Sequence, residues 1–309
     1  MLGIRNIASY IPSGRESNLS AEKIKAFGIT EEFVLKKIGV RERSVMDTNQ
    51  CTSDIALKAL QQLLEKSDLA PTDIQTLIVI TQNPDSNLPH MSAVLHGLGG
   101  LDEKCASFDV GLGCSGYVYG LSIISSFMVA NGFTKGVLVT ADPYSKIVDP
   151  NDKNTALLFG DAATATLIAE DPEFILGPFR FGTIGSLSHA LSCREGKLSM
   201  NGREVFNFAA TRIPSEIRAL LDGSGYQLGD IDAFIFHQGS RYILETIGSR
   251  LEIPLDRIRF GLEDVGNTVS SSIPLLLEKE MAKTGGKKII LSGFGVGLSY
   301  ASCLCQRKI

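Results

Sequence analysis

The sequence has no long run of apolar residues and no strong excess of charge of either sign. No apolar stretch reaches the ~18 residues of a membrane-spanning helix, and residues 1–12 lack the basic start and apolar core of a secretory signal. The formal net charge of −4 argues against a large nucleic-acid-binding surface. These absences predict a cytoplasmic protein that binds neither nucleic acid nor membranes.

Cysteine patterns typical of metal sites are also missing. None of the 6 cysteines belongs to a C-x-x-C pair, and none has a histidine at zinc-finger spacing. We therefore expect no metal site, and we expect every cysteine except Cys114 to be a buried or inert thiol.

What the chain does contain is an alternation of helical and strand patterns. Its 309 residues, 44% of them hydrophobic, suffice for two domains or one duplicated unit, and the alternation predicts an α/β fold. We expect an amphipathic helix over residues 54–67, a helix over 117–131, and strands over 77–81, 106–110, 136–140 and 163–169.

The second half of the chain repeats the first. Residues 69–79 match residues 226–236, each with a turn, an Asp-Ile pair and an apolar strand. Two further strand matches follow in the same order, 136–140 with 288–292 and 164–169 with 300–305. An internal duplication with halves 1–170 and 171–309 is therefore predicted.

The segment Gly111-Leu112-Gly113-Cys114-Ser115-Gly116 has two interpretations. A cysteine in a glycine-rich turn before a helix lies near converging N–H groups and the positive helix end, which should lower the pKa of its thiol. The same letters spell G-x-G-x-x-G, the fingerprint of dinucleotide-binding proteins. The first interpretation predicts an acyl-transfer enzyme, and the second a dehydrogenase.

Two residues of the second half are candidates for the same site. His237 follows the strand 233–236, at the carboxyl edge where open α/β sheets bind ligands, and we interpret it as functional. Asn267, taken alone, reads as a turn or cap residue. The glycine-rich turn Gly293-Phe294-Gly295-Val296-Gly297 is a good place for a backbone N–H group to point into a cleft.

Segments along the whole chain occur in the order and spacing found in β-ketoacyl-acyl-carrier-protein synthase III: Gly39-Val40-Arg41-Glu42-Arg43, residues 108–116, Asp149-Pro150-Asn151-Asp152, Phe159-Gly160-Asp161-Ala162, Gly202-Arg203-Glu204-Val205-Phe206, His237-Gln238, Gly266-Asn267-Thr268 and residues 293–297. The chain thus resembles this family of the thiolase superfamily. The resemblance implies a thiolase-like fold of two βαβαβ-type halves in α-β-α-β-α layers, and a homodimer.

The same resemblance implies a Cys-His-Asn triad at Cys114, His237 and Asn267, with backbone N–H groups of Cys114 and Val296 as the oxyanion hole. The implied reaction is a decarboxylative Claisen condensation. Cys114 carries an acyl primer, which condenses with a malonyl thioester to a β-ketoacyl product of fatty-acid or specialised-metabolite biosynthesis. The substrates are thioesters of coenzyme A or acyl carrier protein, and no bound cofactor or metal is expected.

By the same resemblance, the substrate-binding positions are Phe33, Arg41, Leu88, Lys153, Arg250 and Phe294. Phe33 and Lys153 stand where the family usually has the Trp and Arg that clasp the coenzyme A adenine. Leu88 replaces the Phe that commonly reaches into the partner's acyl site, and Val296 replaces a glycine, so left-handed backbone there would be strained. The smaller Leu88 and a stretch 185–200 that looks shorter than in the family would enlarge or open the acyl cavity, and these two departures favour a primer other than acetyl.

Two alternatives stay open. The first is an acyltransferase on the same fold, which would pass the acyl group to a different nucleophile. An inactive partner subunit is the related possibility, and the presence of all three triad residues argues against it. A nucleotide-dependent dehydrogenase would need an acidic residue after the next strand, for which Asp142 is the candidate.

Overall fold

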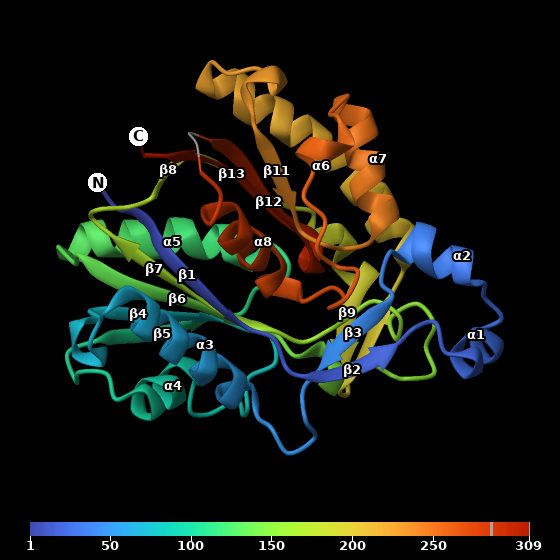
Figure 1. Ribbon diagram of the computed structural model, residues 1–309, viewed down its shortest axis with the longest axis horizontal. Coiled ribbons are helices and arrows are strands. Elements are labelled where there is room, and N and C mark those ends of the chain that lie inside the picture. Colours follow the sequence, from blue (N-terminus) through green and yellow to red (C-terminus); the bar gives the residue numbers. More distant parts are fainter. Residues whose placement is uncertain (285–286, 309) are drawn as a thin grey trace.

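The computed structural model describes residues 1–284 and 287–308. Its main element is a nine-stranded mixed sheet in the order β11-β12-β13-β8-β1-β7-β6-β4-β5 (Figure 1). The strands span β1 Gly3–Tyr10, β4 Thr76–Ile80, β5 Ala106–Val110, β6 Lys135–Ala141, β7 Ala163–Ala169, β8 Phe174–Thr183, β11 Ala233–Phe236, β12 Lys288–Gly295 and β13 Ser299–Arg307.

Long helices follow the strands. They are α3 Thr52–Ser67, α4 Met91–Gly99, α5 Gly116–Asn131, α6 Gly202–Ser224, α7 Arg241–Leu251 and α8 Ser272–Met281. Around the site lie the short helices α1 Ala21–Phe27 and α2 Glu31–Phe33. Two antiparallel strand pairs lie there as well: β2 Gly14–Ser17 with β3 Glu42–Val45, and the hairpin of β9 Leu191–Arg194 with β10 Lys197–Met200.

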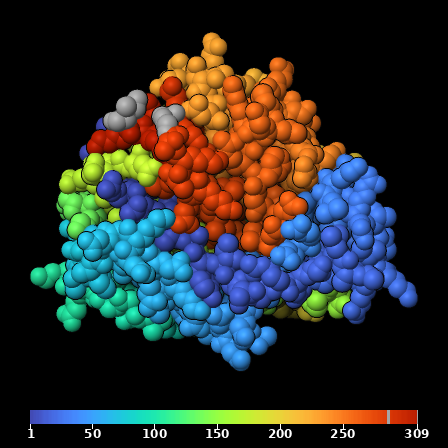
Figure 2. Space-filling view, in the orientation of Figure 1, coloured from blue at the N-terminus to red at the C-terminus, as the bar shows by residue number. Residues whose placement is uncertain are grey.

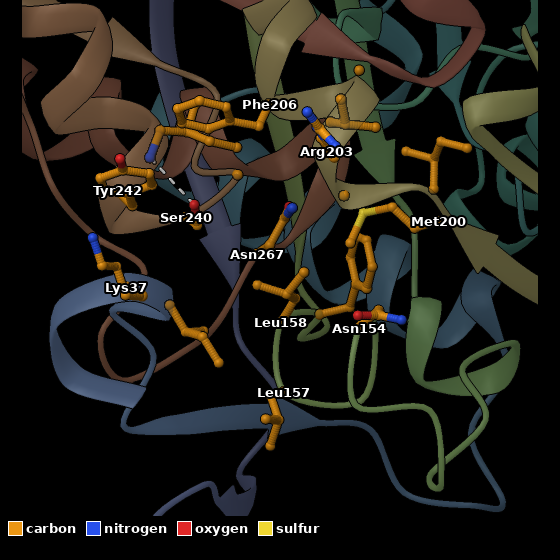
Figure 3. Close-up of a pocket in the computed structure, with 18 of the residues that line it drawn as sticks. Lys37, Asn154, Leu157, Leu158, Met200, Arg203, Phe206, Ser240, Tyr242 and Asn267 are labelled. Atoms are coloured by element: carbon orange, nitrogen blue, oxygen red, sulfur yellow. Dashed lines mark hydrogen bonds between the residues drawn. The ribbon is translucent and has the colours of Figure 1, made fainter. Parts of the chain in front are cut away.

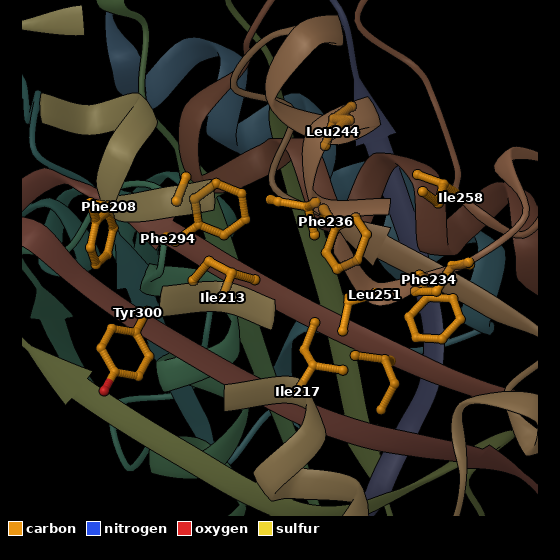
Figure 4. Packing of buried hydrophobic residues seen from close by; sticks show 14 of the residues in the cluster. Phe208, Ile213, Ile217, Phe234, Phe236, Leu244, Leu251, Ile258, Phe294 and Tyr300 are labelled. Carbon is orange, nitrogen blue, oxygen red and sulfur yellow. The ribbon is translucent and has the colours of Figure 1, made fainter. Parts of the chain in front are cut away.

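Alternate residues of each strand face different helix layers. In β4, Leu77 and Val79 pack with α3 and α4, whereas Ile78 and Ile80 pack with α5. In the other half of the sheet, Phe234 and Phe236 of β11 pack with α6 and α7 (Figure 4), and Ile235 packs on the opposite face with α8. The two halves of the sheet thus form separate layers. Helices α3 and α4 cover the outer face of the first half, α6 and α7 cover the outer face of the second half, and α5 and α8 lie between the two halves. This arrangement confirms the five predicted layers.

The predicted duplication is visible in the caps before the matched strands. A 3₁₀ turn precedes both β4 and β11, and each turn is closed by an aspartate. Asp73 Oδ2 accepts from Ala70 N at 3.0 Å, and Asp230 Oδ2 accepts from Gln227 N at 2.8 Å. The following strands then pair in parallel with β6 and β12, respectively. The same local sequence therefore builds the same unit twice.

The two halves of the sheet meet between β1 and β8 through only two residue pairs, Gly3 with Ile175 and Ile4 with Phe174. A second junction forms where the segment after α2 reaches the C-terminal half. Gly39 packs so closely on Arg241 of α7 that a Cβ atom would clash with the Arg241 side chain. Figure 2 shows this junction filled, with the blue N-terminal segment lying against the orange α7.

Most predicted elements are confirmed to within two residues at each end. The helix predicted over 54–67 begins earlier, at Thr52, because the Asp54 carboxylate accepts from the Cys51 N–H group at 2.7 Å and so caps the first turn. Within the described residues, no helix is both long and apolar enough to cross a membrane.

Candidate active site

A cavity of about 330 Å³ lies where the two halves meet, and it brings together Cys114, His237 and Asn267. Cys114 lies between β5 and α5, His237 directly follows β11, and Asn267 lies in the loop before α8. Cys114 and His237 both follow the carboxyl ends of sheet strands, β5 in the first half and β11 in the second. Figure 3 shows Asn267 in the middle of this cavity.

Cys114 is almost fully buried, with 3% of its surface exposed. The turn from β12 to β13 packs its backbone directly against this residue. A Cβ atom on Gly295 would lie 2.7 Å from Cys114 Sγ, and one on Gly293 would lie 2.6 Å from the Cys114 carbonyl oxygen. Glycine is therefore needed at both positions for the turn to approach the sulfur.

The thiol of Cys114 is not activated in the resting protein, contrary to the prediction from its place before a helix. Burial raises the pKa of Cys114 to about 12, and the buried Asp142 carboxyl adds to this rise. Hydrogen bonds from the backbone N–H groups of Val296 and Cys114 lower the pKa as expected, but burial outweighs them. The resting Cys114 side chain is therefore a neutral thiol.

His237 is also neutral. Its side chain is buried, and burial lowers its pKa to about 3. Nδ1 lies 2.9 Å from Ser272 Oγ, and the ring packs edge-on against Phe294 at 5.7 Å between centroids. These contacts fix the ring so that Nε2 points toward Asn267, whose Nδ2 lies 3.4 Å away.

The Ser272 hydroxyl can pair with either tautomer of His237. Ser272 Oγ also lies 2.9 Å from the Val269 carbonyl oxygen, to which it can donate. When the hydroxyl donates there, it accepts from Nδ1–H and leaves Nε2 bare; when it donates to Nδ1, Nε2 carries the proton. Nδ1 therefore has a partner in either tautomer, and Nε2 can act as a base in one tautomer and as a donor in the other.

The Asn267 amide is oriented by its own loop. Its Oδ1 accepts from Val269 N at 2.9 Å, which leaves Nδ2 to face His237 and the cavity. Val269 has a φ of +52°, an unfavourable conformation for a β-branched residue. Strain of this kind is held at functional sites by the surrounding structure.

That surrounding structure consists of segments singled out in the sequence. The Asn267 backbone is clamped by Leu158 O and Gly160 N, at 2.8 and 3.0 Å. The Arg43 guanidinium donates to Phe159 O at 3.1 Å. The segments around Arg43 and Gly160 therefore position the Asn267 loop, and Phe159 in the second segment also lines the cavity.

Val296, the second predicted oxyanion donor, does not have the left-handed backbone that would have strained it. The positive φ of the turn falls on Gly297, at +110°, where glycine tolerates it. Val296 N–H is thus free of strain and directed to the Cys114 thiol.

The cavity opens past a group of aromatic and basic residues from both halves (Figure 3). Phe206 and Tyr242 stack at 5.1 Å, and Lys37 Nζ lies 3.7 Å from the centre of the Tyr242 ring. Among the predicted substrate-binding residues, Phe33, Lys153 and Phe294 line this cavity.

The other three predicted substrate-binding residues lie elsewhere. Arg41 forms an ion pair with Asp264, and Arg250 lies in the last turn of α7, outside the cavity. Leu88 is 87% exposed and does not contact the cavity of its own chain.

The dinucleotide interpretation fails at its acidic residue. Asp142 is fully buried, and its carboxylate accepts from Gln82 N at 2.6 Å and Ser270 Oγ at 2.5 Å, so it is not available to a ribose. Asp142 and Ser272 are site residues that the sequence analysis missed in these roles. The serine-rich stretch after Asn267 was the available signal for Ser272.

Comparison with known proteins agrees with this geometry. The family model for 3-oxoacyl-[acyl-carrier-protein] synthase III matches residues 108–185. The family model for the C-terminal part of the same enzyme matches residues 221–307. The chain is 32% identical to β-ketoacyl-[acyl-carrier-protein] synthase III of Caldanaerobacter subterraneus, over 98% of this chain and 97% of that protein. A second relative, synthase III 2 of Halalkalibacterium halodurans, is 30% identical over 98% of this chain and 96% of its own.

Solved structures show the same fold. A 3-oxoacyl-(acyl-carrier-protein) synthase III superposes with a TM-score of 0.92 at 32% identity, covering 98% of both chains. The priming β-ketosynthase of the R1128 polyketide pathway superposes with a TM-score of 0.89 at 25% identity, covering 99% of this chain and 96% of its own. The chain belongs to the 3-oxoacyl-[acyl-carrier-protein] synthase III family and is a condensing β-ketoacyl synthase of the acyltransferase class.

Proposed function

We propose that Cys114 is the residue that carries the acyl primer. Its Sγ forms a bond to the acyl carbon of a donor thioester as the carbon–sulfur bond of that donor breaks. His237 Nε2, bare in one tautomer, takes the thiol proton and returns it to the leaving thiolate. The backbone N–H groups of Cys114 and Val296, which meet at the sulfur, are the donors for the oxyanion.

In the second step His237 and Asn267 act as hydrogen-bond donors. A malonyl thioester loses its carboxylate as CO₂, and the electrons form an enolate. Between the two steps His237 exchanges protons with solvent to reach the Nε2–H tautomer, and this group and Asn267 Nδ2 stabilise the enolate oxygen. The enolate carbon attacks the acyl carbon, the Cys114 sulfur leaves as a thiolate, and the thiolate takes up a proton from the solvent.

The neutrality of both buried side chains supports this assignment. A thiolate at the fully buried Cys114 would be costly in the resting protein, whereas a neutral Cys–His pair separates charge only when substrate arrives. His237, neutral at any pH well above about 3, can serve both as a base and as a neutral donor.

We further propose that the thioester enters past Phe206, Tyr242 and Phe33, with coenzyme A or acyl carrier protein as the carrier. Three basic side chains, Lys37, Lys153 and Arg203, line this entrance and suit the phosphates of either carrier. The predicted cytoplasmic location is consistent with such substrates.

A homodimer is the proposed assembly. Within the described residues, β5 pairs with β4 alone and its five residues are all half-buried. The edge strand thus offers unpaired backbone groups, and the exposed Leu88 lies in the loop between β4 and α4 of the same half. A second copy paired along β5 would cover both features.

Intact-mass measurement after incubation with acyl thioesters tests the role of Cys114. The wild type should gain one acyl group, and Cys114→Ala should gain none. Cys105→Ala is the matched control, because Cys105 is also a buried thiol, its pKa raised by burial to about 11, but it lies outside the cavity. Absence of any adduct on the wild type, or an adduct on Cys114→Ala, would overturn the proposal.

A further inference from the structure

A second cavity, of about 230 Å³, lies next to the first. Leu191 lines both cavities, and Val296, whose N–H group meets the Cys114 sulfur, lines the second one. Tyr144 packs with Cys114 in the same cluster. An acyl group on the sulfur, with its oxygen at Val296 N–H, therefore has this second cavity beside it.

One wall of this cavity is unusual for a hydrocarbon site, because two side-chain amides form it. The Asn83 Nδ2 atom is buried and has no hydrogen-bond partner in the described chain. The Asn83 backbone is already fixed, since its N–H donates to Thr81 Oγ1 at 3.1 Å and its carbonyl accepts from Thr52 Oγ1 at 2.6 Å. A buried donor without a partner costs ~1–3 kcal/mol, so a group that satisfies it is expected.

The neighbouring Gln82 is also fixed at the wall of this cavity by hydrogen bonds. Its N–H donates to Asp142, and its Oε1 accepts from Tyr144 Oη at 2.9 Å. A Cβ atom on Gly113 would clash with Gln82 Oε1, so glycine at that position makes room for this side chain. No hydrogen bond reaches Gln82 Nε2 from residues 1–284 or 287–308, which leaves a second donor at this wall.

The absence of basic residues from the described lining of this cavity indicates that its ligand is uncharged. The residues around this cavity are Gln82, Asn83, Tyr144, Ile147, Leu191, Ser192, Cys193, Leu198 and Val296, with no Lys, Arg or His among them. A carboxylate buried here would have no cation to pair with, at a large cost. A neutral oxygen can accept from the amides without that cost.

We infer that this cavity binds a short acyl group that carries a neutral oxygen acceptor, a hydroxyl or a carbonyl, in preference to a plain hydrocarbon chain. The inference rests on the proposed function, because it assigns the group that Cys114 carries. Asn83 and Gln82 are the specificity-determining residues, and Leu191 and Leu198 contact the carbon chain.

Matched acyl donors test the inference through the rate of Cys114 acylation. Each oxygenated coenzyme A thioester is compared with its hydrocarbon counterpart: 3-hydroxybutyryl and 4-hydroxybutyryl with butyryl, and 4-oxopentanoyl with pentanoyl. One neutral hydrogen bond predicts a roughly three- to tenfold faster acylation by at least one oxygenated donor. The hydroxy and oxo arms distinguish the two kinds of acceptor, and succinyl-CoA, with its carboxylate, should acylate no faster than butyryl-CoA.

Variants assign the preference to the amide wall. Asn83→Leu, and independently Gln82→Leu, should lower the ratio of oxygenated to hydrocarbon rates toward one. Gln61→Leu, the same change at an exposed position of α3, should leave the ratio unchanged. Thermal melting identifies a variant that does not fold, in which case the other variant and the wild-type ratio decide.

The outcomes separate the two proposals. No adduct from any donor would refute the role of Cys114 itself. Adducts from all donors, with hydrocarbon donors as fast as or faster than oxygenated ones, would overturn the inference and leave that role intact. A wild-type preference that survives both leucine variants would also overturn it.

Discussion

At the scale of single residues, burial controls the chemistry of the site more than the helix end does. Cys114 precedes α5 and accepts two backbone hydrogen bonds, yet its pKa is raised rather than lowered. His237 is pushed in the opposite direction, toward the neutral imidazole. Both shifts favour uncharged side chains, so Cys114 and His237 rest as a neutral pair.

The raised pKa of Cys114 predicts how its alkylation depends on pH. Because only the thiolate reacts, and its fraction rises about tenfold per pH unit below the pKa, alkylation by iodoacetamide should increase steadily from pH 7 to pH 10. Peptide mass mapping follows the Cys114 peptide separately from the exposed Cys51 and Cys193. A rate that levels off near pH 8 would contradict a pKa of about 12.

Ser272 acts through His237 and is therefore a positioning residue. Ser272→Ala removes the partner that holds Nδ1, and we expect kcat to fall by about 10- to 100-fold with little change in KM. Ser272→Thr, which keeps the hydroxyl, should recover most of the activity. Ser215→Ala, which removes an exposed helical hydroxyl, is the control. An equal loss with threonine and alanine would show that Ser272 only fills space.

At the scale of elements, the turn between β12 and β13 decides whether the sulfur is accessible. Gly295→Ala would place a methyl group 2.7 Å from Cys114 Sγ. We expect the acylation rate to fall by at least about tenfold while the protein stays folded, since the backbone φ is not in the left-handed region. Gly223→Ala is the matched control, because a Cβ atom there meets open space. Normal acylation of Gly295→Ala would contradict this description of the turn.

Elements with a strong local signal were predictable from the sequence. The face of α3 that includes Ile55, Leu60 and Leu63 is buried as its spacing predicts, and the repeated Asp-Ile turns mark both halves. The pKa of Cys114 was not predictable, because burial depends on β12 and β13, which lie far away in sequence. The pairing of Ser272 with His237 was missed for the same reason, since it needs the distance to His237.

At the scale of the whole molecule, the site depends on both halves. Cys114 comes from the first half, and His237 and Asn267 come from the second. The division at residue 170 stays a prediction. It agrees with the short contact between β1 and β8, but the shared cavity means that neither half holds the complete set of residues.

The proposed dimer predicts an effect of charge at Leu88. Because this side chain is exposed in the single chain, Leu88→Arg costs the isolated fold little, but it would bury a charge between two copies. Light scattering with size-exclusion chromatography should show a dimer for the wild type and a shift toward monomer for the variant. Leu255→Arg, at another exposed leucine far from β5, should remain dimeric. A monomeric wild type would contradict the proposed assembly.

The central claim is that the acyl group on Cys114 is consumed by condensation. The most direct measurement acylates the enzyme with an isotopically labelled primer, removes the free donor, and adds a malonyl thioester in a single turnover. We predict that the label leaves Cys114 and appears in a β-ketoacyl thioester, with release of CO₂. Label that stays on Cys114, or leaves it only as a free acid or a simple transacylation product, would contradict the account.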